Sequence, residues 1–472
     1  MKTVYFFIGL LISTFSFGQP LTTRLNTAVK KLEADEQFKH AILSMYVVDG
    51  KTGKVIYDKN SQTGLAPASC QKVVTSASAF ELLGKNFRYK TSLYTNITDK
   101  GGGNYEGMIL VYGNGDPSLG SVRYDSTKAE FVLNKWTNIL KRMGIKKFKG
   151  ILRFEDVHDF REMSMLPKGY VWEDIGNYYG ANSWLINWRE NQYDLKFKLG
   201  YTNRRAEIKS VFPQIPNLLF INEVRIGEAG SGDNAYIYCA PYADTAYVTG
   251  TIPPAKDGFT IAGSMPHPSL VLGNELKSAM KENDINVDSC FIVTRGDWPI
   301  YEDERFASEI TSSIQYSPVL DSLNFWFLKK SVNLYGEVFL KTIGQFKTNN
   351  FKTEDGVDVI RDYWGKRGIE KSALNIIDGS GLSPANRVTT NALVTVMQYA
   401  KKQDWFPSFY YALPEMNGLK MKDGYINGVR SFTGYVKSKD GNEYTFSFIV
   451  NNFDGSAGTV REKMWKVLDI LK

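Results

Sequence analysis

Only three cysteines occur among the 472 residues of the sequence, and histidine is equally scarce. Three cysteines cannot form the disulfide framework that stabilises many small exported domains. Of Cys70, Cys239 and Cys290, the last two could form one bridge, which the sequence leaves open.

The histidines do not form a metal-binding pattern with one another or with the cysteines; they are His40, His158 and His267. Metal-dependent hydrolysis and Ser-His-Asp catalysis therefore lack their usual residues. We expect no metal ion and no cofactor. A hydrolase built on this sequence needs another residue as its base.

A long apolar segment is absent after the N-terminus. Residues 4–17 form an apolar run behind Lys2, but a helix that spans a bilayer needs about 20 residues. Ser16 and Gly18 are small residues placed for a cleavage before Gln19. We therefore predict that residues 1–18 are a secretory signal peptide, cleaved near Gly18, and that the mature chain is exported without a transmembrane helix.

A concentrated basic segment is also absent. The formal net charge is +7 and the pI is about 8.9, but the excess is spread along the chain. This pattern does not indicate a nucleic-acid-binding protein. A mildly basic exported protein has a bias towards polyanionic wall polymers.

The length allows two or three domains with their own cores. Residues 90–295 differ from the rest, because they contain short alternating runs and many Gly and Asn turns, which predict mostly β structure in one or two inserted domains. Elsewhere, periodicity and turn residues predict helices within 21–39, 72–83, 309–344, 388–402 and 459–472, and strands flanking the turns at 49–53 and 439–442.

Ser69 and Lys72 lie three residues apart at the start of an apolar segment. On a helix these positions share a face, so Lys72 can take the hydroxyl proton of Ser69. Burial disfavours the ammonium and the helix N-terminus repels positive charge, so both lower the pKa of Lys72. The helix N-terminus also suits an oxyanion. The alternative role for Ser69 is a plain N-cap, and the same spacing recurs at Ser278 and Lys281.

A second polar pair is Ser331 and Asn333. A serine with an asparagine two residues later can relay a proton and bind a substrate carbonyl. The pair carries little information by itself, because Ser322 and Asn324 have the same spacing.

A third element would be a lysine on a strand edge, followed by a hydroxyl residue and a glycine, which together bind a substrate carboxylate. The one Lys-Thr-Gly, residues 51–53, precedes Ser69 in a hairpin turn, and we interpret it as structural. Lys-Asp-Gly occurs three times, and local composition does not separate the copies at 256–258, 422–424 and 439–441.

Together these motifs resemble those of the class C low-molecular-mass penicillin-binding proteins, the D-alanyl-D-alanine carboxypeptidase/endopeptidase family. The resemblance covers nearly the whole mature chain. The first family motif, Pro-Ala-Ser-x-x-Lys, matches residues 67–72, and the Ser-x-Asn motif matches "SVNLYGE", residues 331–337. Two further signatures match "GNGDPSLG" and "DGSGLSPANRVT", residues 113–120 and 378–389. The third motif falls on residues 422–424, because a Val and a Gly-Tyr pair follow in register at 429 and 434–435.

The resemblance implies an α/β fold with a β-lactamase/transpeptidase-like domain, in which helices flank an antiparallel sheet. Residues 19–89 plus 296–472 would form this discontinuous catalytic domain. Residues 90–295 would be the mostly-β region inserted between the first and second motifs.

The resemblance also implies a periplasmic serine DD-peptidase that hydrolyses D-Ala-containing stem peptides or cross-links of peptidoglycan and that β-lactams inhibit covalently. Ser69 would be the acylated nucleophile, Lys72 the general base, and Ser331 the proton donor to the leaving amine. The residues implied to bind substrate are Asn333, Lys422, Asp423, Gly424 and Tyr425. The backbone N–H groups of Ser69 and Tyr425 would form the oxyanion hole.

The sequence departs from the family at Asp423, which replaces a hydroxyl residue that contacts the substrate carboxylate. Two like charges about 5 Å apart at an effective dielectric near 20 repel by roughly 3 kcal/mol, which is about a hundredfold in binding or rate. Either Asp423 points away and pairs with Lys422 or a neighbour such as Lys420, or its pKa is raised, or the substrate differs. This departure motivates the alternative of a non-catalytic or weakly active member that binds wall peptides. A β-lactamase is less favoured, because the large insertion suits a polymer better than a small drug.

Overall fold

The computed structural model describes residues 19–155, 165–199, 205–294 and 310–472. The predicted signal peptide, residues 1–18, lies outside these ranges. Among the helices of the described residues, none combines the length and the apolar character that crossing a bilayer requires.

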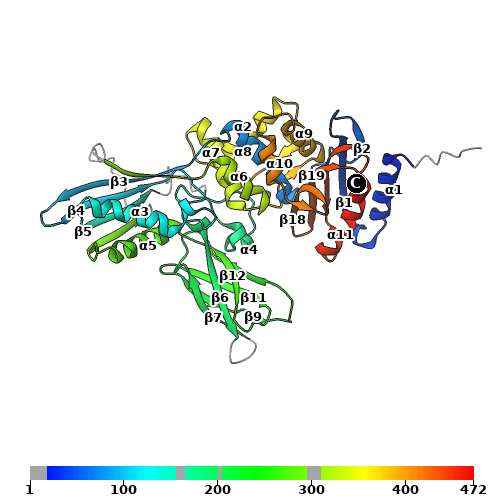
Figure 1. Cartoon of the computed structure of the whole chain (residues 1–472). Coiled ribbons are helices and arrows are strands. Elements are labelled where there is room, and N and C mark those ends of the chain that lie inside the picture. Colours follow the sequence, from blue (N-terminus) through cyan, green and yellow to red (C-terminus); the bar gives the residue numbers. More distant parts are fainter. Residues whose placement is uncertain (1–18, 156–164, 200–204, 295–309) are drawn as a thin grey trace, which may run out of the picture.

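A six-stranded antiparallel sheet joins the two ends of the chain (Figure 1). Its order is β17-β18-β19-β20-β1-β2, so strands from the C-terminal segment pair directly with the first hairpin. The strands are β1 (Ile42–Asp49), β2 (Val55–Lys59), β17 (Glu415–Met416), β18 (Leu419–Ile426), β19 (Val429–Lys437) and β20 (Glu443–Asn451). The predicted strand pairs around residues 49–53 and 439–442 are confirmed.

Helices cover both faces of this sheet (Figure 1). The helices α1 (Leu21–Glu33) and α11 (Ala457–Leu468) pack on one face through a core that includes Met421, Phe432 and Phe448. The other face carries a helical layer that contains α2 (Lys72–Leu82), α6 (Leu320–Lys329), α7 (Asn333–Thr348), α8 (Thr353–Gly365), α9 (Thr390–Ala400) and α10 (Phe406–Ala412). Every residue of α2 from Lys72 to Phe80 is buried, as an apolar helix without a polar face requires.

A five-stranded mixed sheet lies at the opposite end of the molecule (Figure 1). Its order is β13-β5-β4-β3-β14, and the helices α3 (Ala129–Arg142) and α5 (Pro268–Glu282) pack along it. The strands are β3 (Lys90–Asp99), β4 (Asn104–Tyr112), β5 (Lys147–Glu155), β13 (Cys290–Thr294) and β14 (Ile310–Tyr316). Because β14 follows residue 295, the range 90–295 does not contain every strand of this sheet.

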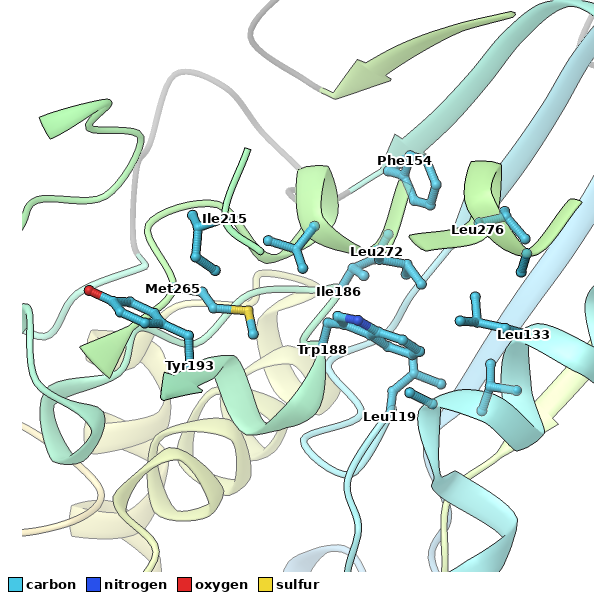
Figure 2. Packing of buried hydrophobic residues seen from close by; sticks show 14 of the residues in the cluster. Leu119, Leu133, Phe154, Ile186, Trp188, Tyr193, Ile215, Met265, Leu272 and Leu276 are labelled. Atoms are coloured by element: carbon cyan, nitrogen blue, oxygen red, sulfur yellow. The ribbon is translucent and has the colours of Figure 1, made fainter. Parts of the chain in front are cut away.

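Two smaller sheets complete the inserted part of the chain. One has the order β12-β6-β7, and the other is built on β10-β11-β8 with β9 beside β11. One cluster of buried residues includes Leu133 of α3, Leu272 of α5, Tyr193 of β6 and Val248 of β11, so these sheets share a core with the five-stranded one. Figure 2 shows part of this cluster, from Tyr193 to Leu133. The strands are β6 (Gln192–Leu199), β7 (Ala206–Phe212), β8 (Leu219–Asn222), β9 (Arg225–Ile226), β10 (Asn234–Tyr238), β11 (Thr245–Ile252) and β12 (Phe259–Ser264).

Two of the predicted helices were wrong in extent. The first helix ends at Glu33 instead of near residue 39, because the carboxylate of Asp35 accepts from the N–H of Gln37 and starts a separate 3₁₀ turn, Glu36–Phe38. In the segment predicted as helix from residue 309, the first described residues form strand β14, which pairs with β3; residue 309 lies outside the described ranges.

All three cysteines lie in the described residues, and each is a free thiol. Cys239 and Cys290 are both free and buried, and so is Cys70. The bridge that the sequence left open is therefore not formed, and burial raises the pKa of each thiol to about 11.

Candidate active site

Ser69 lies in the 3₁₀ helix η2 (Ala68–Gln71), which leads directly into α2. The alternative of a plain N-cap is wrong, because the N-terminus of α2 has no side-chain cap and the serine oxygen faces Lys72 instead. The preceding residue, Ala68, has φ +46°, a left-handed conformation that is uncommon for alanine. Backbone strain of this kind is found where a fold fixes a functional turn.

Lys72 is the centre of the hydrogen-bond network around Ser69. Its Nζ lies 2.8 Å from the Oγ of Ser69, 2.6 Å from the Oδ1 of Asn333 and 2.7 Å from the backbone oxygen of Ser380. The side chain is fully buried. These three partners match the three N–H donors of an ammonium, and loss of one proton leaves a lone pair directed at the Ser69 hydroxyl.

The surroundings of Lys72 make its neutral form accessible. Burial and, after it, the positive charge of Lys422 lower the pKa of Lys72 to about 7, although Asp378, Glu337 and Asp423 act in the opposite direction. A lysine with this pKa can act as a base near neutral pH. The predicted lowering of the pKa of Lys72 is thus present, and burial is its largest cause.

Asn333 and Ser331 come from the segment that begins α7. The amide of Asn333 is fixed at both ends, because Oδ1 accepts from Lys72 and Nδ2 donates to the backbone oxygen of Tyr179 at 2.7 Å. Ser331 is partly buried and has φ +58°, in the left-handed region. Within the described part of the chain, no hydrogen bond joins Ser331 to Ser69 or Lys72.

Strand β18 brings Lys422, Gly424 and Tyr425 close to the 3₁₀ turn η2, which carries Ser69. The Sγ of Cys70 lies 3.2 Å from the backbone oxygen of Lys422, and a Cβ on Gly424 would lie only 2.9 Å from the backbone nitrogen of Ser69. Position 424 therefore requires a glycine. Beyond Lys420, no described strand pairs with β18 on the side away from β19, so residues 422–426 form an open sheet edge with Tyr425 exposed.

Asp423 pairs with the preceding lysine, which is one of the arrangements expected from the sequence. Nζ of Lys422 donates to the Oδ1 of Asp423 at 3.0 Å and to its backbone oxygen at 2.7 Å. Burial opposes ionisation of Asp423, but the charges of Lys422 and Arg430 outweigh it, so the pKa of Asp423 is lowered. The alternative of a raised pKa is therefore wrong.

A loop at residues 378–383 supports Lys72, although the sequence pattern indicates no role for its individual residues. The carboxylate of Asp378 accepts from the N–H groups of Gly381 and Ser383, each at 2.7 Å. The carboxylate of Glu337 accepts from the N–H of Gly379 at 3.0 Å. These bonds fix the loop that carries the Ser380 carbonyl. Burial, then the charge of Asp378, raises the pKa of Glu337 to about 7.

The inserted part of the chain also reaches this network. The hydroxyl of Tyr170 donates to the Oε1 of Glu337 at 3.0 Å and lies 3.2 Å from the Oγ of Ser380. Tyr179 supplies the carbonyl that fixes Asn333. The site is therefore built from both parts of the chain, and a backbone carbonyl leaves no signal in a sequence by which it could have been found.

The other copies of these motifs lie away from Ser69. Residues 51–53 form the turn between β1 and β2, and Asp257 and Asp440 are exposed in turns. Ser278 is exposed on α5. Within the described ranges, no group of three or more His, Cys, Asp or Glu side chains is arranged to hold a metal ion. The arrangement around Ser69 supports acyl transfer with a lysine base.

Comparisons with known proteins agree with this chemistry. The chain matches the D-Ala-D-Ala carboxypeptidase 3 (S13) family over residues 25–418 and 414–469. It is 24% identical over 468 residues to the D-alanyl-D-alanine carboxypeptidase of Actinomadura sp. (strain R39), covering 92% of this chain and 82% of that protein. It is 20% identical over 476 residues to the D-alanyl-D-alanine carboxypeptidase DacB of Haemophilus influenzae. This match covers 97% of this chain and 94% of that protein.

The fold is similar to that of a penicillin-binding protein of known structure. The crystal structure of penicillin binding protein 4 (dacB) from Haemophilus influenzae has a TM-score of 0.77 at 18% identity, covering 95% of this chain and 99% of that one. A second structure of that protein, complexed with a β-lactam, has a TM-score of 0.73. The predicted α/β fold is confirmed by this match. The relatives are named as carboxypeptidases, so the non-catalytic alternative is not favoured. The chain belongs to the D-Ala-D-Ala carboxypeptidase 3 (S13) family and is a serine-type DD-peptidase.

Proposed function

We propose that Ser69 is the acylated nucleophile of this peptidase and that Lys72 is its general base. The observation that carries the proposal is the 2.8 Å contact between Nζ of Lys72 and Oγ of Ser69, at a lysine whose pKa is lowered to about 7. Neutral Lys72 takes the hydroxyl proton as the oxygen attacks the carbonyl carbon of a D-Ala residue. The hydrogen bonds to Asn333 and Ser380 hold Nζ in place during this transfer.

The remaining roles are proposed from the resemblance to the family. The tetrahedral oxyanion is bound by the backbone N–H groups of Ser69 and Tyr425, for which the close approach at Gly424 leaves room. Ser331 passes the proton to the leaving amine, and Asn333 and Lys422 bind substrate. The acyl-enzyme is then hydrolysed by water, with Lys72 again acting as base. An extended peptide can lie along the open edge of β18.

The proposed substrates are D-Ala-containing stem peptides of peptidoglycan and the cross-links between them, so that the protein acts as carboxypeptidase, endopeptidase or both. β-Lactams are proposed to acylate Ser69, a reactivity supported by the β-lactam complex of the Haemophilus influenzae protein. The proposed location is the periplasm, after cleavage of residues 1–18.

The proposed domain division keeps residues 19–89 in the catalytic domain together with the C-terminal segment. The pairing of β14 with β3 favours an end of the inserted region after Tyr316 rather than at residue 295. The inserted region is not only β, because α3 and α5 pack on its largest sheet.

Fluorescent-penicillin labelling and D-Ala release from muropeptides test the proposed nucleophile. We expect Ser69→Ala to abolish both. Ser278→Ala is the matched control, because Ser278 also precedes a lysine by three residues but is exposed on α5. The proposal is wrong if Ser69→Ala retains labelling and turnover, or if Ser278→Ala loses them as well.

A further inference from the structure

The ammonium group of Lys422 donates its hydrogen bonds to the next residue in the chain, Asp423. Nζ donates to the backbone oxygen of Asp423 at 2.7 Å and to its Oδ1 at 3.0 Å. The lysine side chain is only 1% exposed, so it cannot turn towards solvent without a rearrangement. An ammonium has three N–H donors, and Asp423 uses two of them before any substrate binds.

The carboxylate of Asp423 remains both charged and accessible. Its side chain is 32% exposed, and the guanidinium of Arg430 lies 4.0 Å from its second oxygen. Two cations therefore hold this carboxylate in its ionised form beside the open edge of β18. A ligand at this edge meets an anion directly next to the lysine.

The consequence for substrate choice rests on the proposed function, in which Ser69 attacks a D-Ala carbonyl and the leaving residue lies beside Lys422. A free α-carboxylate on the leaving residue would meet a lysine that is already paired and a second carboxylate beside it. Taken alone, the repulsion between two carboxylates about 5 Å apart at an effective dielectric near 20 corresponds to about a hundredfold in binding or rate.

A carboxamide in the same position is complementary to both groups. Its oxygen can accept the remaining N–H of Lys422, and its NH₂ group can donate to Asp423, whereas a carboxylate has no proton to donate. We propose that Asp423 makes this peptidase selective for D-Ala–X bonds whose leaving residue X carries an amidated α-carboxyl group. Asp423 is then a specificity-determining residue that repels a free carboxylate and also binds a carboxamide.

Two matched synthetic substrates test this selectivity. One is Nα,Nε-diacetyl-L-lysyl-D-alanyl-D-alanine with a free C-terminus, and the other is the same tripeptide with a C-terminal carboxamide. The quantity measured is the ratio of kcat/KM for the amide to kcat/KM for the acid. We expect the wild type to favour the amide by at least about tenfold, and Asp423→Asn and Asp423→Thr to lower the ratio by about tenfold to a hundredfold.

Asp440→Asn is the matched control, because Asp440 belongs to another Lys-Asp-Gly but is exposed in a turn; it should leave the ratio unchanged. The thermal midpoint of each variant reports whether it is folded, and if both Asp423 variants fail to fold, the wild-type ratio decides alone. The selectivity is overturned by a wild-type ratio near or below one, or by a ratio that folded Asp423→Asn does not lower. If the wild type cleaves neither tripeptide and Ser69 is not labelled, the proposed function itself is wrong.

Discussion

The carboxylate of Glu337 accepts a 3.0 Å hydrogen bond from the backbone N–H of Gly379. Gly379 precedes Ser380, whose carbonyl binds Nζ of Lys72 at 2.7 Å. The start of α7 therefore positions the proposed base through the loop that carries the Ser380 carbonyl. Tyr170, from the inserted part of the chain, bonds to the same carboxylate.

This relationship predicts a catalytic effect of a residue outside the catalytic motifs. Tyr170→Phe removes a hydroxyl that bonds to Glu337 and lies near Ser380, and one such hydrogen bond contributes about 1 kcal/mol. We expect kcat to fall by about threefold to tenfold, with little change in KM, because Lys72 is less well fixed.

Tyr105→Phe is the control for this prediction. Tyr105 also lies in the inserted region, and its hydroxyl donates to the backbone oxygen of Met143 at an exposed position. Steady-state kinetics on a D-Ala-D-Ala peptide should separate the two variants. Equal activity of Tyr170→Phe and the wild type would remove the proposed support of Lys72 by the inserted region.

The pH dependence of acylation should follow the titration of Lys72. Burial, then the charge of Lys422, lowers the pKa of Lys72 to about 7. Only the neutral amine can accept the Ser69 proton, so the acylation rate should rise with pH, with a midpoint near the pKa of Lys72. Stopped-flow or quenched labelling with a fluorescent penicillin measures this profile.

Lys422→Met should move that midpoint upwards. The positive charge of Lys422 is the second cause of the lowered pKa of Lys72, so its removal favours the ammonium form of Lys72. The substitution also leaves the negative charge of Asp423 without its lysine partner, which acts in the same direction. We expect a shift of about one pH unit; an unchanged or lower midpoint would show that Lys72 does not set the profile.

Gly424→Ala should disable the site by a steric effect. The added Cβ would lie 2.3 Å from the Oγ of Ser431, 2.7 Å from the backbone oxygen of Pro67 and 2.9 Å from the backbone nitrogen of Ser69. The strand and the turn must separate, which displaces the proposed oxyanion hole, and loss of one such donor costs about a hundredfold or more in kcat.

Gly365→Ala is a control for the alanine substitution itself. Gly365 is the last residue of α8, and its added Cβ would meet atoms no closer than 3.9 Å. We expect labelling of Ser69 by a fluorescent penicillin to persist in Gly365→Ala and to be strongly slowed in Gly424→Ala. Similar rates in the two variants would contradict the close approach of β18 to Ser69.

The sequence predicts the Ser69–Lys72 contact because the two residues are three positions apart at the start of an apolar segment, and side-chain spacing decides which groups can meet. It does not predict the partners of Lys72 and Asn333 that are backbone carbonyls. Ser380 and Tyr179 contribute these carbonyls, and any residue in the same backbone conformation would do so. The fold that creates these conformations is not visible in local composition.

Strand β14 shows a second limit of pattern analysis. Its buried positions include Ser313 and Gln315, whereas Ile314 between them is only partly buried. The apolar residues therefore do not mark the buried face, and the pattern that normally indicates a half-buried strand does not apply to this segment. Pairing with β3, which lies more than two hundred residues earlier in the chain, determines the structure of this segment.

Mass spectrometry of the protein after reaction with penicillin tests whether Ser69 is the acylated nucleophile. Intact mass shows whether one penicilloyl group is attached, and proteolysis of the adduct maps the residue. We expect a single adduct on Ser69 that Ser69→Ala eliminates. An adduct on another residue, or no adduct on a folded protein that still releases D-Ala, would contradict it.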